Sequence, residues 1–338
     1  MKHLLGKLGA FAPLITCVAM FLFFSLITDT FLTSENLLNI LRQNSALAIM
    51  AVGITFVLLT AEIDLSIENM AIFAGVLAAY LYKSFAASGV MPGVLVQALP
   101  ILIAVLACMG FGLLNGFGVA RLGVPSFMMT LALFLITKGL SLRITRGTPI
   151  FEIPPVLAYV GTKSIPLLHG TNEAGEQIPW IEIPLITIAA AFALAIALVV
   201  LRYTRFGRSV YAVGGNRQAA QLSGVNVSLT LVACLCICSI TAGLSGIILI
   251  GRLGSAQAGG LDNMLIACIS AVVLGGTSLF GGKGGIANTV VGVLTLGILY
   301  NGLNHVQIDI YLKESISGAI LMAALVLNVS MARIRGVQ

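Results

Sequence analysis

Charged residues are scarce in this sequence. Asp, Glu, Lys and Arg together make up 9% of the 338 residues, whereas an ordinary soluble domain has roughly 25%. Apolar residues reach 59%, and the mean hydropathy is +1.07. A water-soluble fold of this length is therefore excluded, because too few charged side chains are present to cover its surface. We also expect no nucleic-acid partner, because no soluble module is present that could carry a basic stripe.

The residue combinations that indicate a metal or catalytic centre are also lacking. His3, His169 and His305 lie in separate parts of the chain, so no two of them stand at ligand spacing. The six cysteines all lie within apolar runs, which favours packing residues over a disulfide framework or a zinc site. We therefore predict no catalytic residue, no metal site and no cofactor in this chain.

One glycine-rich segment raises the question of nucleotide binding. Residues 281–284 (GGKG) join glycines to a lysine, as phosphate-binding loops do. A Walker loop also needs a Gly five residues before its Gly-Lys pair and a Ser or Thr after it. This sequence has Thr277 and Gly284 at those positions. The chain therefore lacks its own means of hydrolysing ATP.

Long apolar runs occupy most of the sequence. At roughly 20 residues per crossing, they predict about ten membrane-spanning helices in one transmembrane domain, 1–338. The predicted fold class is an all-α integral membrane protein, a polytopic bundle with broken or re-entrant segments. Residues 33–44 are predicted to form a separate short amphipathic helix at the membrane surface. The predicted spans lie near 8–28, 45–60, 68–85, 94–119, 125–145, 183–202, 229–250, 263–280, 286–304 and 310–330.

The distribution of charge predicts which of the segments that connect the predicted spans, here called joints, face the cytoplasm. Four arginines within 202–217 have no acidic residue among them, and such clusters are expensive to translocate. We therefore place the joint at about 203–228 in the cytoplasm, and alternation of the spans then puts both termini there as well. The joint at about 146–182 contains four glutamates and several prolines, which fits the outer side.

A cluster of polar residues lies between the second and third predicted spans, at Glu62, Asp64 and Ser66. Polar groups at such a place are costly unless they face a cavity or a partner. Asp64 or Ser66 could cap the next helix by accepting backbone N–H bonds. Alternatively, the cluster breaks a helix within the membrane and lines a solute path. Both interpretations remain open from the sequence.

Residues 275–285 are too rich in glycine for a continuous helix, because each Gly costs roughly 1 kcal/mol relative to Ala. We therefore predict a break or a re-entrant turn there, with Thr277 and Ser278 as candidate path residues. In the joint that follows the sixth span, residues 216–222 can form a short helix bounded by Gly215 and Gly224. It is either part of a solvated basic loop or a docking helix for a cytoplasmic partner, and the second interpretation explains more.

Several segments resemble one known family, the membrane permease subunits of sugar ABC importers of the ribose, galactose and autoinducer-2 type. The resemblance covers nearly the whole chain. The segments that carry it are 63–66 (IDLS), 125–127 (PSF), 145–150 (TRGTPI), 204–216 (TRFGRSVYAVGGN), 219–220 (AA), 223–227 (SGVNV) and 271–279 (AVVLGGTSL).

This resemblance implies a subunit of a bacterial inner-membrane importer that pairs with a second permease, identical or a sister chain. Cytoplasmic ATP-binding subunits would drive it by alternating access, and a periplasmic or surface-tethered sugar-binding protein would deliver the solute. As translocation-path residues of such a subunit we name Glu62, Asp64, Ser66, Thr277 and Ser278. The implied ATPase-coupling residues are Thr204, Arg205, Phe206, Gly207, Arg208, Gly214, Gly215, Asn216, Ala219 and Ala220.

The sequence departs from the family pattern at a few positions. Ala61 and Glu62 stand where the family usually has two glycines, which adds a carboxylate, and Lys138 stands where Arg is usual. An ion-coupled secondary transporter, with Glu62 and Asp64 as the coupling carboxylates, is the alternative function.

Overall fold

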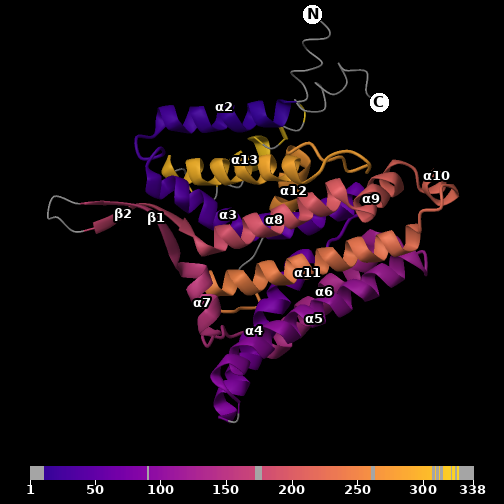
Figure 1. Cartoon of the computed structure of the whole chain (residues 1–338), viewed down its shortest axis with the longest axis horizontal. Coiled ribbons are helices and arrows are strands. Elements are labelled where there is room, and N and C mark those ends of the chain that lie inside the picture. The colour runs from indigo at the N-terminus through magenta and orange to yellow at the C-terminus, as the bar shows by residue number, and fades with distance from the viewer. Residues whose placement is uncertain are drawn as a thin grey trace, which may run out of the picture.

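The structure of the chain is a computed structural model (Figure 1). It describes residues 11–89, 91–171, 177–259, 263–306, 309, 312, 315–320, 322–323 and 326, and the side chains of 168–181 lie outside the description.

Helices make up most of the described chain, and one antiparallel hairpin interrupts them. The strands are β1 (Ser164–Thr171) and β2 (Gln177–Pro184). The helices are α2 (Ala12–Ile27), α3 (Ser34–Leu59), α4 (Ile67–Ser88), α5 (Gly93–Ala120), α6 (Ser126–Thr145), α7 (Pro155–Thr162), α8 (Leu185–Tyr203), α9 (Arg205–Gly215), α10 (Arg217–Leu222), α11 (Val227–Leu253), α12 (Met264–Leu274) and α13 (Ile286–His305).

Seven of the described helices are long and apolar enough to cross a membrane, namely α3, α4, α5, α6, α8, α11 and α13. Helices α2 and α12 are apolar but shorter. The 11 residues of α12 rise about 16 Å, against roughly 30 Å of hydrocarbon. The chain is thus a multi-pass membrane protein, and the predicted count of about ten spans is not confirmed. Much of the tenth predicted span, 310–330, lies outside the described residues.

Helix α3 is the most deeply buried of the seven, and α11 runs antiparallel to it with close backbone contact. The Ser245 hydroxyl of α11 donates to the Ala46 carbonyl of α3 at 2.7 Å. Gly53 permits the approach, since a Cβ there would lie 2.6 Å from the Cα of Cys238. Small residues commonly allow membrane helices to pack this closely. Helix α11 also packs on α4, α5 and α7.

The prediction of a separate surface helix at 33–44 is wrong, because these residues form the first part of α3. The Thr33 hydroxyl caps the helix by accepting from the Asn36 N–H at 3.3 Å. Asn36 of this segment is buried and pairs with α13, whereas Glu35 and Gln43 are exposed. Asn36 and Asn301 exchange hydrogen bonds at 3.0 and 2.8 Å, and His305 Nε2 lies 2.9 Å from Asn36 Oδ1.

The joint predicted on the outer side contains regular structure that an all-α fold class does not include. It holds α7 and the β1–β2 hairpin, in which Ile165 pairs with Ile183. Lys83 of α4 forms an ion pair of 2.8 Å with Glu152, just before α7. The Lys83 ammonium lowers the pKa of the Glu152 carboxyl below its usual value, chiefly by donating a hydrogen bond to it. Helix α7 is held tightly to α11, because a Cβ on Gly251 would overlap the backbone of Leu157.

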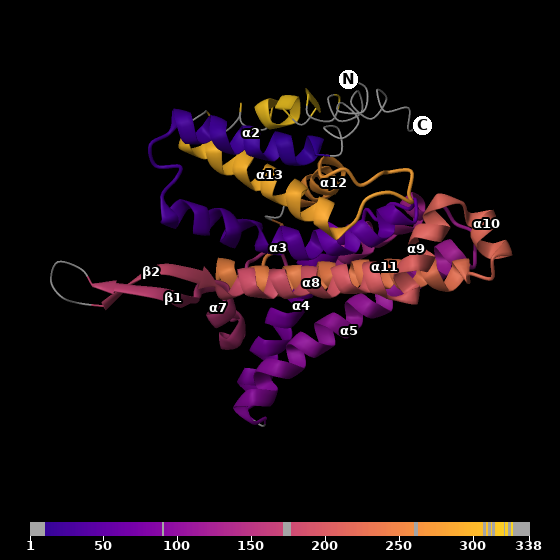
Figure 2. The same ribbon diagram turned by 45° about the horizontal axis from the view of Figure 1, so that its top comes forward.

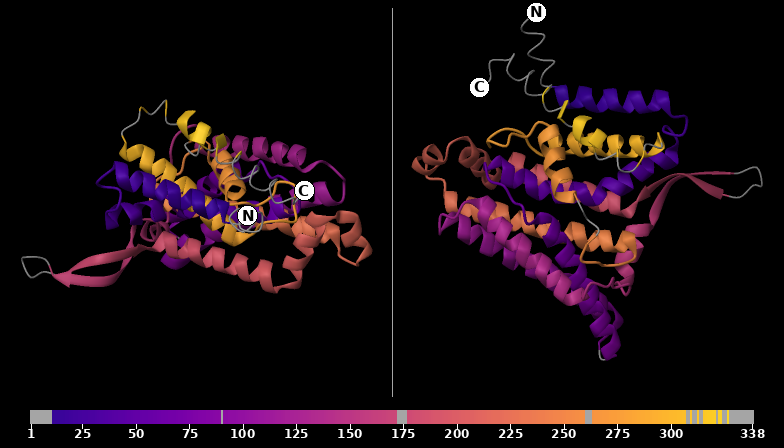
Figure 3. Two further views of the ribbon diagram at one scale, coloured as in Figure 1. Left: turned by 90° about the horizontal axis from the view of Figure 1, so that it is seen from above. Right: turned by 180° about the vertical axis from the view of Figure 1, so that it is seen from behind.

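The two long joints lie at opposite ends of the helical body. The β1–β2 hairpin and α7 extend from one end, and α9 and α10 form the other, as Figures 1 and 2 show. The same separation is seen from above and from behind in Figure 3. Since α8 connects the hairpin to α9, this arrangement agrees with the prediction that the two joints face opposite sides of a membrane.

Candidate coupling site

The joint after α8 is helical along most of its length. Thr204 caps α9, its hydroxyl accepting from the Gly207 N–H at 3.1 Å. Asn216 ends α9 and caps α10, with Oδ1 accepting from the Ala219 N–H at 2.9 Å. The short helix predicted at 216–222 is therefore confirmed as α10. Helix α9 was not predicted. Its sequence contains two arginines and a serine and ends in two glycines, a composition that indicated a loop.

Helix α9 buries one face against the body of the protein. Val210 and Val213 are buried, and the Phe206 ring stacks on Phe56 of α3 with centroids 6.0 Å apart. The opposite face is exposed and carries Arg205 and Arg208. The amphipathic helix is thus anchored on one side and leaves its cationic side open.

The end of α9 meets two segments that are far from it in the sequence. A Cβ on Gly214 would overlap the carbonyl oxygen of Leu59, at the end of α3, and would lie 2.7 Å from the Gly282 nitrogen. Gly282 itself donates to the Leu59 carbonyl at 3.0 Å. The Tyr211 hydroxyl donates to the Gly284 carbonyl at 3.0 Å. Helix α9 therefore contacts both the end of α3 and the glycine-rich segment 275–285.

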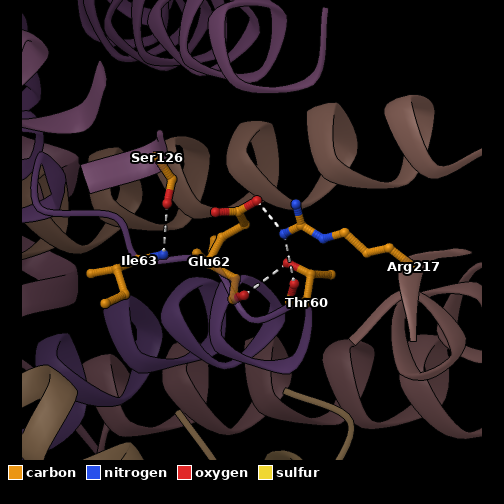
Figure 4. A network of polar contacts seen from close by, with 6 residues as sticks. Thr60, Glu62, Ile63, Ser126 and Arg217 are labelled. Atoms are coloured by element: carbon orange, nitrogen blue, oxygen red, sulfur yellow. Dashed lines mark hydrogen bonds and ion pairs between the residues drawn. The ribbon is translucent and has the colours of Figure 1, made fainter. Parts of the chain in front are cut away.

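The segment between α3 and α4 is non-helical, which agrees with both open interpretations. Glu62 is 8% exposed, and Arg217 Nη2 donates to both Glu62 Oε1 and, at 3.3 Å, the Thr60 carbonyl. Figure 4 shows the Arg217 side chain reaching from α10 to this pair, and Ile63 facing Ser126 of α6 on the other side. The Ile63 N–H donates to the Ser126 hydroxyl at 3.3 Å.

Asp64 and Ser66 lie deeper, and both are 0% exposed. Asp64 Oδ1 accepts from the Ser66 N–H at 2.9 Å and from the Ser66 hydroxyl at 2.6 Å. Ser66 is also 3.4 Å from Asn115 Nδ2 of α5. Asp64 therefore satisfies backbone at the start of α4, whereas the Ser66 side chain caps nothing. Asp64 Oδ2 has no hydrogen-bond partner among the described residues.

The predicted break at 275–285 is confirmed, because α12 ends at Leu274 and α13 begins at Ile286. The Thr277 hydroxyl accepts from the Gly285 N–H at 3.3 Å. The Ser278 hydroxyl accepts from the Phe280 N–H at 3.1 Å. The hydroxyls of Thr277 and Ser278, both candidate path residues, therefore stabilise the loop at 275–285. The glycines with positive φ, which other residues rarely adopt, are Gly276, Gly281, Gly282, Gly284 and Gly285.

The structure divides the predicted site residues into two groups. Glu62 contacts α10, and Thr277 and Ser278 belong to the loop that contacts α9. Asp64 and Ser66 are fully buried just before α4, where Ser66 contacts Asn115 of α5. Sequence reasoning did not name Arg217 or Tyr211 as site residues, although they make the side-chain contacts that connect the joint to these segments. The signal for Arg217 was its position directly after a capping Asn216.

Among the described residues, no three His, Cys, Asp or Glu side chains group to hold a metal ion.

The chain matches the protein family described as branched-chain amino acid transport system / permease component over residues 36–325. It is 34% identical over 322 residues to the ribose import permease protein RbsC of Escherichia coli K12, covering 93% of this chain and 92% of that protein. Identity to the protein of the same name from Bacillus subtilis 168 is 33% over 326 residues, with 96% and 94% covered. The xylose transport system permease protein XylH of E. coli K12 is 30% identical over 367 residues, with 94% and 91% covered. No solved structure matches the chain.

Proposed function

The chain belongs to the family of branched-chain amino acid transport system permease components, and on this premise we propose that it is the membrane subunit of an ATP-driven importer of a sugar or sugar-like polyol. A member of this family is part of a transport system and is not an enzyme. The names of the ribose and xylose permeases, which this chain matches over more than nine-tenths of its length, support a sugar as the solute.

The observation that carries the proposal is the meeting of α9 and α10 with both broken segments. Energy released by ATP hydrolysis outside this chain has to reach the membrane helices through a surface that faces the ATPase. Gly214 lies against Leu59 and Gly282, and Tyr211 bonds Gly284. A displacement of α9 is therefore passed directly to the end of α3 and the start of α13. We place the coupling residues, 204–220, at this joint, with ATP bound by separate cytoplasmic subunits and no cofactor in this chain.

The exposed chemistry of the joint indicates the kind of partner surface it fits. Arg205 and Arg208 are exposed on α9, and the sequence has no acidic residue between Glu182 and Asp262. Leu222, the last residue of α10, is 91% exposed. An ATP-binding subunit that docks here needs an acidic rim around an apolar pocket, since complementary charge directs association and buried apolar anchors hold it.

Helix α6 supports the proposal of a second permease subunit. Lys138 lies inside this span, about two turns from its nearer end, and is exposed among Leu131, Leu135 and Leu142. A lysine facing lipid at this depth is costly, whereas one facing an aqueous path or a partner helix is not. We propose that this face of α6 meets the second permease, an identical or a sister chain, along the translocation path.

For the path itself we retain Asp64, Ser66, Thr277 and Ser278. Glu62 was predicted in the same set, but its carboxylate is paired with Arg217 of α10 and faces the coupling joint. Residues 1–338 would act as one domain, which the single main hydrophobic core from α2 to α13 supports.

We assign the chain to a bacterial inner membrane with both termini cytoplasmic. The α9–α10 end would face the cytoplasm, and the β1–β2 end would receive a periplasmic or surface-tethered binding protein. An ion-coupled transporter that uses Glu62 and Asp64 is less favoured, because the relatives are import permeases and Glu62 is already paired with Arg217.

The test is reconstitution into proteoliposomes with an ATP-binding subunit and a solute-binding protein of the same transport system. We expect uptake of radiolabelled ribose or xylose that requires both ATP and the ATPase. The chain alone, under a proton or sodium gradient, should take up neither sugar. Gradient-driven uptake, or ATP-driven uptake of leucine but of neither sugar, would overturn the proposal.

A further inference from the structure

The contact between Glu62 and Arg217 joins two segments that are separated by 155 positions in the sequence. Glu62 lies in the break between α3 and α4, and Arg217 is the first residue of α10. The Glu62 side chain is 9% exposed, whereas that of Arg217 is 45% exposed. The pair therefore has one member inside the protein and one on the surface that α9 and α10 form.

The break that carries Glu62 is held from two sides. On one side, Arg217 donates to both the Glu62 carboxylate and the Thr60 carbonyl. On the other side, the Ile63 N–H donates to Ser126 and the Leu65 N–H donates to Thr130 at 3.1 Å, both on α6. Helix α4 starts two residues after Leu65. A movement of α10 that carries Glu62 with it therefore pulls on the start of α4, relative to α6.

Stability alone does not account for this pair. The desolvation cost of a buried carboxylate roughly cancels its attraction to an arginine, so apolar replacements of such pairs are often neutral. Arginine adds something that an apolar contact lacks, because its planar Nη2 can donate to a carboxylate and a carbonyl at once, in one fixed geometry. A contact of this kind fixes the relative orientation of the two segments as well as the distance between them.

We propose that Glu62 and Arg217 form a positioning link that passes the movement of α10 into the α3–α4 break, so that ATP hydrolysis outside the chain is coupled to rearrangement of the membrane helices. This inference rests on the proposed function. It assigns Glu62 to coupling, not to solute binding, and it adds Arg217 to the coupling residues. Neither side chain contacts the solute in this assignment.

The experiment uses the complete complex in proteoliposomes and measures ribose, or xylose, imported per ATP hydrolysed. The variants are Glu62→Gln, Arg217→Gln and the double variant, because glutamine removes the charge with little change in shape at position 62. We expect each single variant to lower the import-to-hydrolysis ratio at least about fivefold, the lower end of coupling between protein sites. The double variant should lower the import-to-hydrolysis ratio no further than the worse single variant does, because all three variants remove the same interaction. Arg217→Lys should restore part of the ratio.

A matched control breaks a different ion pair by the same chemical change. Lys83→Gln removes the partner of Glu152 at the opposite end of the protein, where both side chains are about half exposed, and the import-to-hydrolysis ratio should stay at the wild-type value. The amount of complex extracted and the ATPase co-purified with it report on folding.

Two results would overturn the inference. One is a wild-type ratio in either single variant, and the other is a double variant whose loss equals the product of the two single losses. Failure of the proposed function has a different signature, since the wild-type complex itself would then import neither sugar.

Discussion

Gly214 lies so close to the carbonyl oxygen of Leu59 that no side chain fits between α9 and the end of α3. The two residues are joined further by Gly282, which donates to the same carbonyl at 3.0 Å. A glycine in a helix costs roughly 1 kcal/mol relative to alanine, so its presence here is explained by the approach of the two backbones. This contact is where the coupling joint is held against the membrane helices.

Replacing Gly214 with alanine should therefore separate α9 from α3. We expect ATP-driven sugar uptake to fall at least about fivefold, since overpacking a tight contact typically costs 1–3 kcal/mol and each 1.4 kcal/mol is about tenfold. Uptake of radiolabelled sugar into proteoliposomes measures this fall. Gly110→Ala is the control, because a Cβ at that position of α5 meets nothing within 4 Å. Equal uptake in the two variants would contradict the assigned contact.

The exposed cations of α9 should govern association with the ATP-binding subunit. Arg208→Glu is expected to weaken that association and to uncouple uptake from hydrolysis, while membrane insertion stays intact. Because exposed charges are screened at high ionic strength, wild-type association should weaken as salt rises, and the variant should show a smaller salt dependence. Co-purification of the ATPase across a salt series reports both. Unchanged association and uptake would remove Arg208 from the docking surface.

Asp64 allows its structural and transport roles to be separated. Asp64→Asn keeps an oxygen that can accept from both Ser66 donors, so the thermal midpoint in detergent should hold while sugar uptake falls. Asp64→Ala leaves the buried Ser66 N–H without its partner and should destabilise the fold by about 1–3 kcal/mol. If Asp64→Asn transports at the wild-type rate, Asp64 serves only the start of α4.

Lys138 should be reachable from water in the assembled complex. Lys138→Cys is expected to react with a membrane-impermeant thiol reagent, whereas Phe192→Cys, exposed on α8, should not. The wild-type chain gives the background from its own cysteines. Protection of position 138 at the level of position 192 would place this face of α6 in lipid.

Local chemistry made some of these features predictable. Glycine density predicted the break at 275–285, and a capping asparagine with flanking glycines predicted α10. Both signals lie within a few residues of the structure they determine. Apolar runs likewise predicted the long spans, although they could not show that α12 is only 11 residues long.

Contacts between distant segments were not predictable in the same way. The polar residues of 33–44 indicated a surface helix, because the sequence does not show that Asn36 pairs with Asn301, 265 positions away. Glu62 was read as a path residue for a similar reason, since nothing near it in the sequence supplies the arginine that it meets. The β1–β2 hairpin was missed because its prolines and glutamates resemble those of a loop.

Helix α11 has a mechanical consequence for the whole transporter. It is one unbroken helix of 27 residues, about 40 Å long, that begins just after α10 and ends where its glycine backbone is pressed against α7. This helix contains no proline, the commonest cause of a kink, so we expect a tilt at one end to be carried along its length. A movement of α10 should therefore also shift α7 and the hairpin at the opposite end of the protein.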